Sequence, residues 1–318
     1  MNLYKQMVRI LSYLNNQELI DGIHAAVPEA KVIFIDQSQP LTENLEADCL
    51  LCVASFLDGL EKVITATKGL KWIHIFGTGI DGFPLEATGD AILTSSRGAS
   101  AVQVAEWAFT CILAARKNLP ENWINAPSPL WSIADNIGAV QGQTLSIFGF
   151  GSIGRELAKR ALAFNMQVLT TTRHSSVTMD GVETADSLEA LFAKADHLVL
   201  AAPATTETDN IVNAKTLSYL KPEAHLVNIA RGSLVDENDL KQALDDGKLA
   251  RASLDAVKTE PLPADHWIYG HEKVFFSPHL AWCDMQVIDA ISTSFLDNLA
   301  LFAKQEPLNN VVDKKAGY

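Results

Sequence analysis

The 318-residue chain has few cysteines, no long apolar run and no excess of positive charge. No apolar run approaches the ~18 residues of a membrane span, and the segment after Met1 lacks the apolar core and cleavage site of a signal peptide. A net charge of -13 argues against nucleic acid and anionic membranes as partners. We therefore expect a cytoplasmic protein with no membrane or nucleic-acid partner.

The four cysteines follow no ligand or disulfide pattern. Cys49 and Cys52 have the C-x-x-C spacing of some zinc and redox sites, but they lie inside a strand-like apolar run. The sequence holds no second Cys pair or His pair at ligand spacing. We expect buried strand cysteines, no metal site and the reducing environment of the cytoplasm.

Strand-like and helix-like segments alternate along the whole chain, which is typical of doubly wound parallel sheets. The composition is globular, with 48% apolar and 20% charged residues, and the length favours two domains. In the first part, strands are predicted at residues 8–14, 31–35, 49–54, 71–76 and 91–94, with helices at 17–26 and 57–67.

A second unit begins with a predicted helix at residues 100–118. Six strands follow, at residues 145–148, 167–171, 197–201, 225–229, 252–254 and 274–276. A last helix, residues 285–304, is expected to return to the first domain. The predicted fold is α/β: a Rossmann cofactor domain, residues 99–285, inserted into a flavodoxin-like substrate domain, residues 1–98 and 286–318. Both boundaries would lie in helices, and the cleft between the domains would hold the substrate.

The most informative segment is residues 143–154, where a short apolar strand leads into the sequence G-x-G-x-x-G and then a helix-like pattern. In this context Gly149 permits the tight turn, Gly151 lets a pyrophosphate approach the backbone, and Gly154 lets the helix pack on the strand. We expect a dinucleotide to contact Gly149, Gly151, Ser152, Ile153 and Gly154.

The residues after the next strand indicate which dinucleotide is bound. An NAD site places an Asp or Glu about 20 residues after the glycines, to bind the ribose 2′-hydroxyl. This chain has Thr172, Arg173, His174 and Ser175 there, and no acid before Asp180. A guanidinium with neighbouring hydroxyls can bind a 2′-phosphate, which a carboxylate would repel. We expect NADP(H) to be preferred and NAD(H) to be possible; an ordinary polar loop is the alternative.

Arg231, Glu260 and His279 each follow an apolar strand downstream of the glycine motif, where ligands bind in open α/β sheets. A 2-keto acid reductase needs such a set. Arg binds a carboxylate and polarises the keto oxygen, His donates a proton to that oxygen, and Glu fixes the His tautomer and favours the imidazolium. Singly, they could be a surface ion pair, a turn cap and a hydrogen-bonded loop residue; in this order they indicate a catalytic site.

With these motifs the chain resembles the D-isomer-specific 2-hydroxyacid dehydrogenases over nearly its whole length. Beside the glycine motif, the resemblance lies in residues 70–73, 77–81, 104–107, 228–236, 254–255, 260–263 and 277–281. It implies that Arg231 binds and polarises the substrate, that His279 is the acid/base and that Glu260 supports His279.

The resemblance also implies binding residues. Backbone amides near Thr78, Gly79 and Ile80 would hold the substrate carboxylate, and Asp255 would contact the nicotinamide carboxamide. The nicotinamide site would be lined by Pro203, Ala230, Arg231 and His279.

The chain departs from the family pattern at several positions. Thr78 stands where many members have a smaller residue, and Arg97, where many have proline, could face the cleft or the solvent. Thr172 and Arg173 are similar to the NADPH-using glyoxylate and hydroxypyruvate reductases. Trp282 also resembles that subgroup, and either walls the substrate pocket or packs at a helix start.

We therefore expect an NAD(P)H-dependent oxidoreductase that interconverts small 2-keto acids, such as glyoxylate or hydroxypyruvate, with D-2-hydroxy acids. Phosphoglycerate dehydrogenase is the nearest alternative. It would need cations for a phosphate, which Lys71, His74 and Arg97 could supply, but the chain shows no acid at position 172 and no C-terminal regulatory domain.

Two other classes use similar glycine-rich loops. A dinucleotide-sensing, corepressor-like binding protein would not need the set of Arg231, Glu260 and His279. An S-adenosylmethionine methyltransferase would need neither the third glycine nor the basic cluster after the second strand.

Residues 119–131 form a Pro- and Trp-rich arm that contains Trp123 and Trp131. Exposed aromatic residues of this kind mark interfaces more often than solvent loops, and the family resemblance implies a homodimer through the cofactor domain. The alternative is that both tryptophans pack on their own domain.

Overall fold

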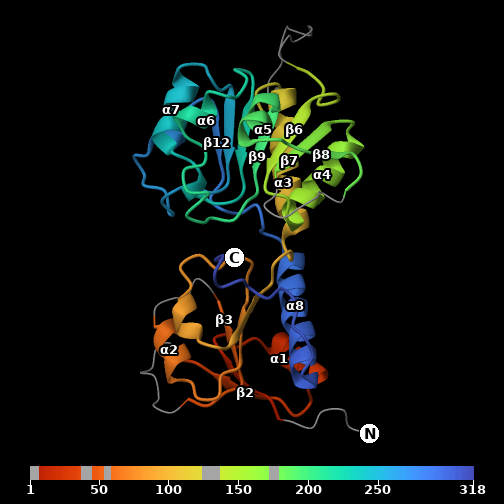
Figure 1. Ribbon diagram of the computed structural model, residues 1–318, viewed down its shortest axis with the longest axis vertical. Coiled ribbons are helices and arrows are strands. Elements are labelled where there is room, and N and C mark those ends of the chain that lie inside the picture. The colour runs from red at the N-terminus through yellow and green to blue at the C-terminus, as the bar shows by residue number, and fades with distance from the viewer. Residues whose placement is uncertain (1–6, 37–44, 54–58, 124–136, 172–178) are drawn as a thin grey trace. The chain divides into compact units, whose positions relative to one another are not determined.

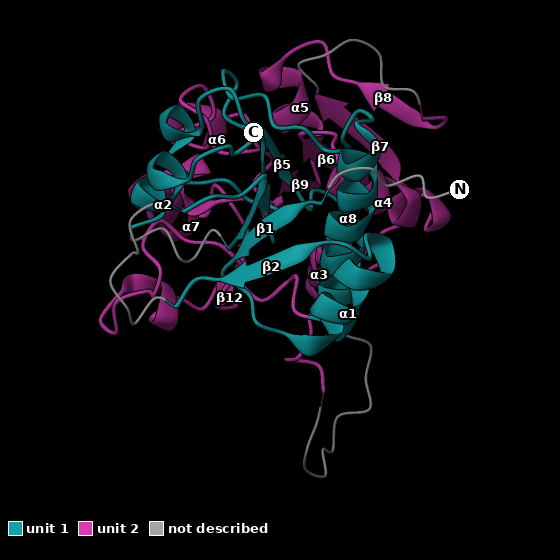
Figure 2. Ribbon diagram, turned by 90° about the horizontal axis from the view of Figure 1, so that it is seen from below, with its two compact units in different colours: residues 1–100, 284–318 teal, residues 101–283 magenta. Residues whose placement is uncertain are grey.

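The computed structural model describes residues 7–36, 45–53, 59–123, 137–171 and 179–318. The chain divides into two compact units, Met1–Ser100 with Asp284–Tyr318 and Ala101–Cys283 (Figure 2). Both divisions fall directly before a helix rather than inside one. Each unit is built on one parallel sheet covered by helices, which confirms the predicted α/β class.

The first unit has a five-stranded sheet in the order β2-β1-β3-β4-β5, the flavodoxin-like order. The strands are β1 Arg9–Ser12, β2 Lys31–Phe34, β3 Cys49–Cys52, β4 Trp72–Ile75 and β5 Ile92–Ser95. The helices are α1 Gln17–Ala26, α2 Leu60–Ala66, the short 3-10 turn η1 Leu85–Thr88, and α8 Met285–Lys304. Helix α8 therefore returns to the first unit, where it lies beside α1 (Figure 1).

Side chains alternate between the two faces of this sheet, as the strand period of two requires. Trp72 packs under α1 and α8, whereas Ile73 packs under α2. The same alternation separates the two thiols of the C-x-x-C sequence, because Cys49 lies on the α1/α8 face and Cys52 on the α2 face. Both are fully buried, and burial raises the pKa of the Cys52 thiol to about 12. They are core residues of a strand, as predicted.

The second unit has a seven-stranded parallel sheet in the order β12-β11-β10-β9-β6-β7-β8, which is the Rossmann order with one further strand. The strands are β6 Thr144–Phe148, β7 Gln167–Thr171, β8 Val182–Thr184, β9 His197–Leu200, β10 His225–Asn228, β11 Arg251–Leu254 and β12 Val274–Phe276. The prediction of six strands was wrong, because it omitted β8. This edge strand has one half-buried and two exposed side chains, so it carries no apolar pattern.

Helices cover both faces of the second sheet. The face of Leu145 and Val199 packs against α3 Ala101–Lys117 and α4 Ser152–Ala163. The face of Leu198 and Leu226 packs against α5 Leu188–Lys194, α6 Ala214–Leu217 and α7 Glu237–Asp245. Two 3-10 turns, η2 Gly232–Leu234 and η3 Trp267–Gly270, complete the unit. Across the described ranges, the structure contains no helix with the length and hydropathy needed to span a membrane.

Candidate active site

Three ionisable residues lie beyond the carboxyl ends of neighbouring strands in the second unit. Arg231 follows β10, Glu260 follows β11 and His279 follows β12, and the three strands are adjacent in the sheet. Parallel strands present their carboxyl ends at one edge, where ligands bind in this class of fold. The three segments therefore share one edge of the sheet.

Glu260 and His279 are in direct contact. His279 Nδ1 donates to Glu260 Oε2 at 2.7 Å, because a carboxylate can only accept. The other oxygen, Oε1, accepts the backbone N–H of Val257 at 3.1 Å. The two side chains are 37% and 38% exposed, so the pair is open to a ligand. Since Nδ1 is bonded to Glu260, Nε2 is the ring nitrogen left to act on a substrate.

The loop that carries His279 is fastened by Asp255, which is 3% exposed. Asp255 Oδ1 accepts from Ser277 Oγ at 2.6 Å and from the backbone N–H of Leu280 at 2.9 Å. Its Oδ2 accepts from the N–H of Ala281 at 3.0 Å, and its backbone carbonyl accepts from the N–H of His279 at 2.9 Å. These bonds hold His279 at a φ of 52°, a conformation that few residues other than glycine adopt.

The sequence did not reveal this anchoring role of Asp255. Its carboxylate accepts three hydrogen bonds from the loop. A carboxylate offers about four acceptor positions, so one remains for the carboxamide contact that the family resemblance implies.

A buried asparagine holds the backbone of Arg231. Asn228 Nδ2 donates to the carbonyl of Arg231 at 2.9 Å and to that of Ala256 at 3.3 Å, which ties the ends of β10 and β11 together. Gly232 lies so close to the second segment that a Cβ on it would be 1.9 Å from the carbonyl carbon of Val257. The turn at Arg231 therefore packs directly on the segment that leads to Glu260.

The glycine motif forms the turn between β6 and α4. Gly149 has a φ of 100°, and a Cβ on it would be 2.7 Å from the backbone nitrogen of Ala202. A Cβ on Gly154 would be 2.6 Å from the Gly149 carbonyl oxygen, so only glycine lets α4 pack this closely. Gly151, the N-cap of α4, has no side-chain cap, and a Cβ there would meet no atom of the described residues within 4 Å. The helix N-terminus is thus open on this side, which suits a pyrophosphate.

Other predicted residues of the second unit lie near the same edge or outside the described ranges. Pro203 is exposed after β9, Ala230 is buried after β10, and Ser152 and Ile153 begin α4. The indole of Trp282 donates to the carbonyl of His279 at 3.0 Å and remains 40% exposed, so it stands beside the histidine. The 2′-phosphate candidates Thr172, Arg173, His174 and Ser175 lie outside the described residues.

The first unit holds the remaining candidates. Thr78, Gly79 and Ile80 follow β4, and Arg97 is exposed after β5. His74 was expected to be able to supply positive charge for a substrate phosphate, and this is wrong. The residue is fully buried, and burial lowers its pKa to about 3. Its ring bonds to Thr94 Oγ1 at 2.8 Å and to Ser96 Oγ at 3.1 Å.

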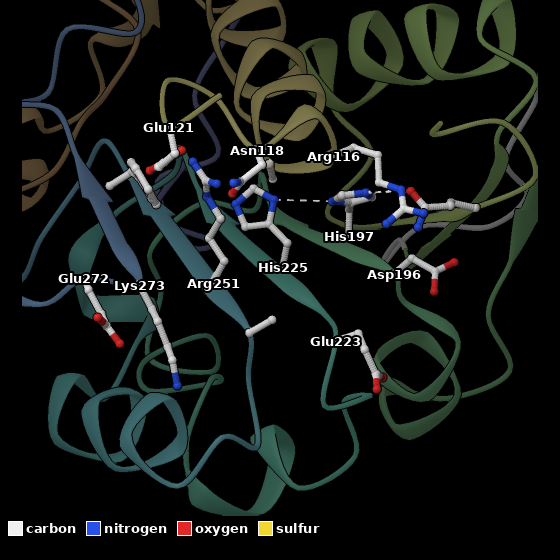
Figure 3. Close-up of a pocket in the computed structure, with 14 residues that line it drawn as sticks. Arg116, Asn118, Glu121, Asp196, His197, Glu223, His225, Arg251, Glu272 and Lys273 are labelled. Atoms are coloured by element: carbon white, nitrogen blue, oxygen red, sulfur yellow. Dashed lines mark hydrogen bonds between the residues drawn. The ribbon is translucent and has the colours of Figure 1, made fainter. Parts of the chain in front are cut away.

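A cavity of about 500 Å³ lies at the opposite, amino-terminal edge of the second sheet (Figure 3). His197, His225 and Arg251, which begin β9, β10 and β11, line it. The Nδ1 atoms of the two histidines are 3.3 Å apart. Burial lowers the pKa of His197 to about 4, and it also holds the pKa of His225 well below the usual histidine value. None of the predicted site residues that the structure describes lines this cavity.

Residues 109–281 match the family model of the D-isomer specific 2-hydroxyacid dehydrogenase, NAD binding domain. The match covers more than half of the chain. The chain belongs to this family. The NAD binding domain so identified includes the glycine turn, Arg231, Glu260 and His279.

Two named relatives align with most of this chain. The glyoxylate reductase of Thermococcus litoralis is 31% identical over 283 residues, 85% of this chain and 84% of that protein. The D-3-phosphoglycerate dehydrogenase of Methanocaldococcus jannaschii is 28% identical over 98% of this chain, but only 58% of that protein is covered. The chain thus spans about half the length of several D-3-phosphoglycerate dehydrogenases that it matches.

Among solved structures, the NADPH-dependent glyoxylate/hydroxypyruvate reductase from Sinorhizobium meliloti, in complex with NADP and sulfate, aligns with a TM-score of 0.79 at 25% identity. The alignment covers 98% of this chain and 100% of that chain.

Proposed function

We propose that this 2-hydroxyacid dehydrogenase reduces small 2-keto acids, such as glyoxylate or hydroxypyruvate, to D-2-hydroxy acids with NADPH. One observation carries the proposal. Within the NAD binding domain, a partly exposed histidine is hydrogen-bonded at 2.7 Å to a glutamate, and an arginine follows the strand next to that of the glutamate. A binding protein that only sensed the nucleotide would have no need of this pair.

Each residue has a defined role in the proposed reaction. Arg231 binds the substrate carboxylate and polarises the keto oxygen with its planar guanidinium. His279 donates a proton from Nε2 to that oxygen, while Glu260 holds Nδ1 and stabilises the charged ring. A nicotinamide dinucleotide held at the glycine turn would supply the hydride for the keto carbon. In the reverse direction, neutral His279 accepts the hydroxyl proton at Nε2.

The remaining site residues are proposed to position the two ligands. The open N-terminus of α4, with Gly151, Ser152 and Ile153, would bind the pyrophosphate. Pro203 and Ala230 would line the nicotinamide, and the spare acceptor of Asp255 would bind its carboxamide. In the first unit, backbone amides near Thr78, Gly79 and Ile80 would bind the substrate carboxylate, and in the second unit Trp282 would border the substrate beside His279.

We propose NADP(H) as the preferred cofactor. The basis is the sequence Thr172-Arg173-His174-Ser175, which offers a guanidinium and hydroxyls where NAD sites have an acid. The Sinorhizobium meliloti reductase, named as NADPH-dependent and crystallised with NADP, supports this assignment.

Oxidation of 3-phosphoglycerate is the second candidate, because a D-3-phosphoglycerate dehydrogenase aligns with 98% of this chain. A phosphate on the substrate would need additional cations. Of the three residues considered, His74 is neutral and Lys71 lies 3.4 Å from Asp48, which leaves Arg97. This favours the smaller, unphosphorylated keto acids.

We further propose a homodimer in the cytoplasm. Trp123 is 73% exposed, and Asn118 and Glu121 just before it line the cavity at the amino edge of the second sheet. Exposed tryptophan next to a hollow surface suits a protein interface. Trp131 lies outside the described residues. A monomer mass by light scattering at micromolar concentration would contradict the dimer.

The proposed activity is tested by following oxidation of NADPH and NADH with a panel of 2-keto acids. The wild type should turn over glyoxylate or hydroxypyruvate, and His279→Ala should lose roughly 10²–10⁴-fold in kcat while still binding NADPH. A His279→Ala protein with near-native kcat would remove the assignment. A wild type that binds NADPH but reduces no keto acid would favour the corepressor-like reading.

A further inference from the structure

Glu237, the first residue of α7, reaches the segment that carries Glu260. Its Oε1 accepts the backbone N–H of Lys258 at 2.8 Å, and its side chain is 15% exposed. Its Oε2 lies 3.4 Å from Nε2 of His266. Within the described part of the chain, Glu237 forms no hydrogen bond or ion pair with Glu260 or His279. We therefore look for its effect on the reaction in the backbone that it binds.

Two successive amide groups of one turn bind two different glutamates. The N–H of Val257 donates to Glu260 Oε1 at 3.1 Å, and the next N–H, of Lys258, donates to Glu237. Glu260 in turn accepts from His279 with its other oxygen. The two N–H groups belong to adjacent peptide units, 256–257 and 257–258, which share the Cα of Val257. Holding the second unit therefore restricts rotation of the first, whose N–H binds the Glu260 carboxylate.

We propose that Glu237 is a positioning residue, which fixes the turn at residues 257–258 and thereby aims Glu260 at His279. The inference rests on the proposed function and adds to it a residue from a different element, α7. Without Glu237, the Lys258 N–H loses its acceptor and the turn gains freedom to rotate. Glu260 then spends less time against the imidazole.

The test compares pH–rate profiles of keto-acid reduction for Glu237→Ala and Glu237→Gln. The alanine variant should lose roughly three- to tenfold in kcat, the scale set by one lost hydrogen bond. Its activity should also fall off at a lower pH than in the wild type, with KM for NADPH unchanged. The glutamine variant has no negative charge, but it keeps a side-chain oxygen that can accept from the Lys258 N–H. It should therefore restore most of the kcat and most of the wild-type pH profile.

A matched control lies at the other end of the same helix. Asp245, the last residue of α7, is 3.2 Å from Nε2 of His271 and also pairs with Lys241, away from the turn at 257–258. Asp245→Ala should leave the pH profile unchanged. If Asp245→Ala and Glu237→Ala shift the pH–rate profile equally, the effect is a general one of altering α7, and the inference is overturned.

A double variant separates action through Glu260 from an independent effect. If Glu237 acts through Glu260, then Glu237→Ala with Glu260→Gln should shift the profile no further than Glu260→Gln alone. Additive shifts would overturn the proposal, as would a native profile in Glu237→Ala. Thermal unfolding of each variant verifies that it is folded. An inactive wild type would refute the proposed function instead, so the two failures are distinguishable.

Discussion

Nδ1 of His279 lies 2.7 Å from Oε2 of Glu260, although the two residues follow different strands of the sheet. The contact exists because β11 and β12 are neighbours and because Asp255, at the end of β11, bonds the loop after β12. The same carboxyl edge thus supplies both the histidine and the group that orients it. Nε2 of His279 is left for the substrate.

Replacing Glu260 with glutamine should move the alkaline limit of keto-acid reduction to lower pH. The glutamine oxygen can still accept from Nδ1, so the ring keeps its orientation, but the negative charge that stabilises the imidazolium is lost. Reduction requires the protonated ring, whereas oxidation requires the neutral ring and should suffer less at alkaline pH. The measurement is kcat against pH in both directions. An unchanged alkaline limit would show that Glu260 carries no charge-dependent role.

Arg231→Lys should impair activity although the positive charge is kept. An ammonium group cannot reproduce the planar, two-pronged hydrogen bonding of a guanidinium to a carboxylate. A loss of roughly 10- to 100-fold in kcat/KM is expected, which is the scale of about 1.5–3 kcal/mol for a charge-assisted hydrogen bond. Steady-state kinetics with glyoxylate measure it. A lysine variant with native kcat/KM would mean that Arg231 acts only as a point charge.

Thr172→Asp combined with Arg173→Ala should shift the cofactor preference from NADPH toward NADH. The wild type should have the higher kcat/KM with NADPH. The double variant removes the cation for a 2′-phosphate and adds a carboxylate for a ribose hydroxyl. The change in preference should be roughly ten- to hundredfold. If the wild type has the higher kcat/KM with NADH, then Thr172 and Arg173 do not form a 2′-phosphate site.

Much of the fold could be predicted from the sequence, because the residue patterns that define most helices and strands lie within those segments. Helices α1 and α8 begin and end where predicted, at residues 17–26 and 285–304, and both have side-chain N-caps, Asn16 and Asp284. Strand β8 was missed because three residues with little burial give no apolar period, and only its pairing with β7 defines it.

Part of the site could also be predicted, because its residues stand next to local strand patterns. Charged residues directly after apolar strands had to meet at one edge of a parallel sheet. The hydrogen bonds that support the site could not be predicted from the sequence, because they join distant residues. Asp255 binds residues more than 20 positions away, and Glu237 binds Lys258 across 21 positions. His74 was misjudged because its neutrality depends on burial under α8, which begins over 200 residues later.

Gly232→Ala should lower both the stability and kcat. A Cβ at this position would be 1.9 Å from the carbonyl carbon of Val257, so the segment before Glu260 must move. Such overpacking costs about 1–3 kcal/mol, and the displaced turn should weaken the contact of Glu260 with His279. Gly270→Ala is the control, because a Cβ there meets no atom within 4 Å. Equal kcat and equal melting temperatures in both variants would contradict the close approach.

His74→Gln should reduce the acid sensitivity of the first unit. Burial lowers the pKa of His74 to about 3 in the folded protein, whereas an unfolded histidine titrates near ~6.5. The unfolded chain therefore binds the extra proton first, so this contribution to stability is complete above pH ~6.5 and declines toward pH ~3. At pH 5 the loss from His74 should be about 2 kcal/mol. Glutamine has no such proton to bind, and it can still bond Thr94 or Ser96.

Urea unfolding of wild type and variant at pH 7 and pH 5 should show their free energies of unfolding converging by about 2 kcal/mol as the pH falls. His24→Gln is the control, because His24 is exposed on α1 in the same unit. A His74→Gln protein with the same pH dependence as the wild type would show that His74 is not held neutral by burial.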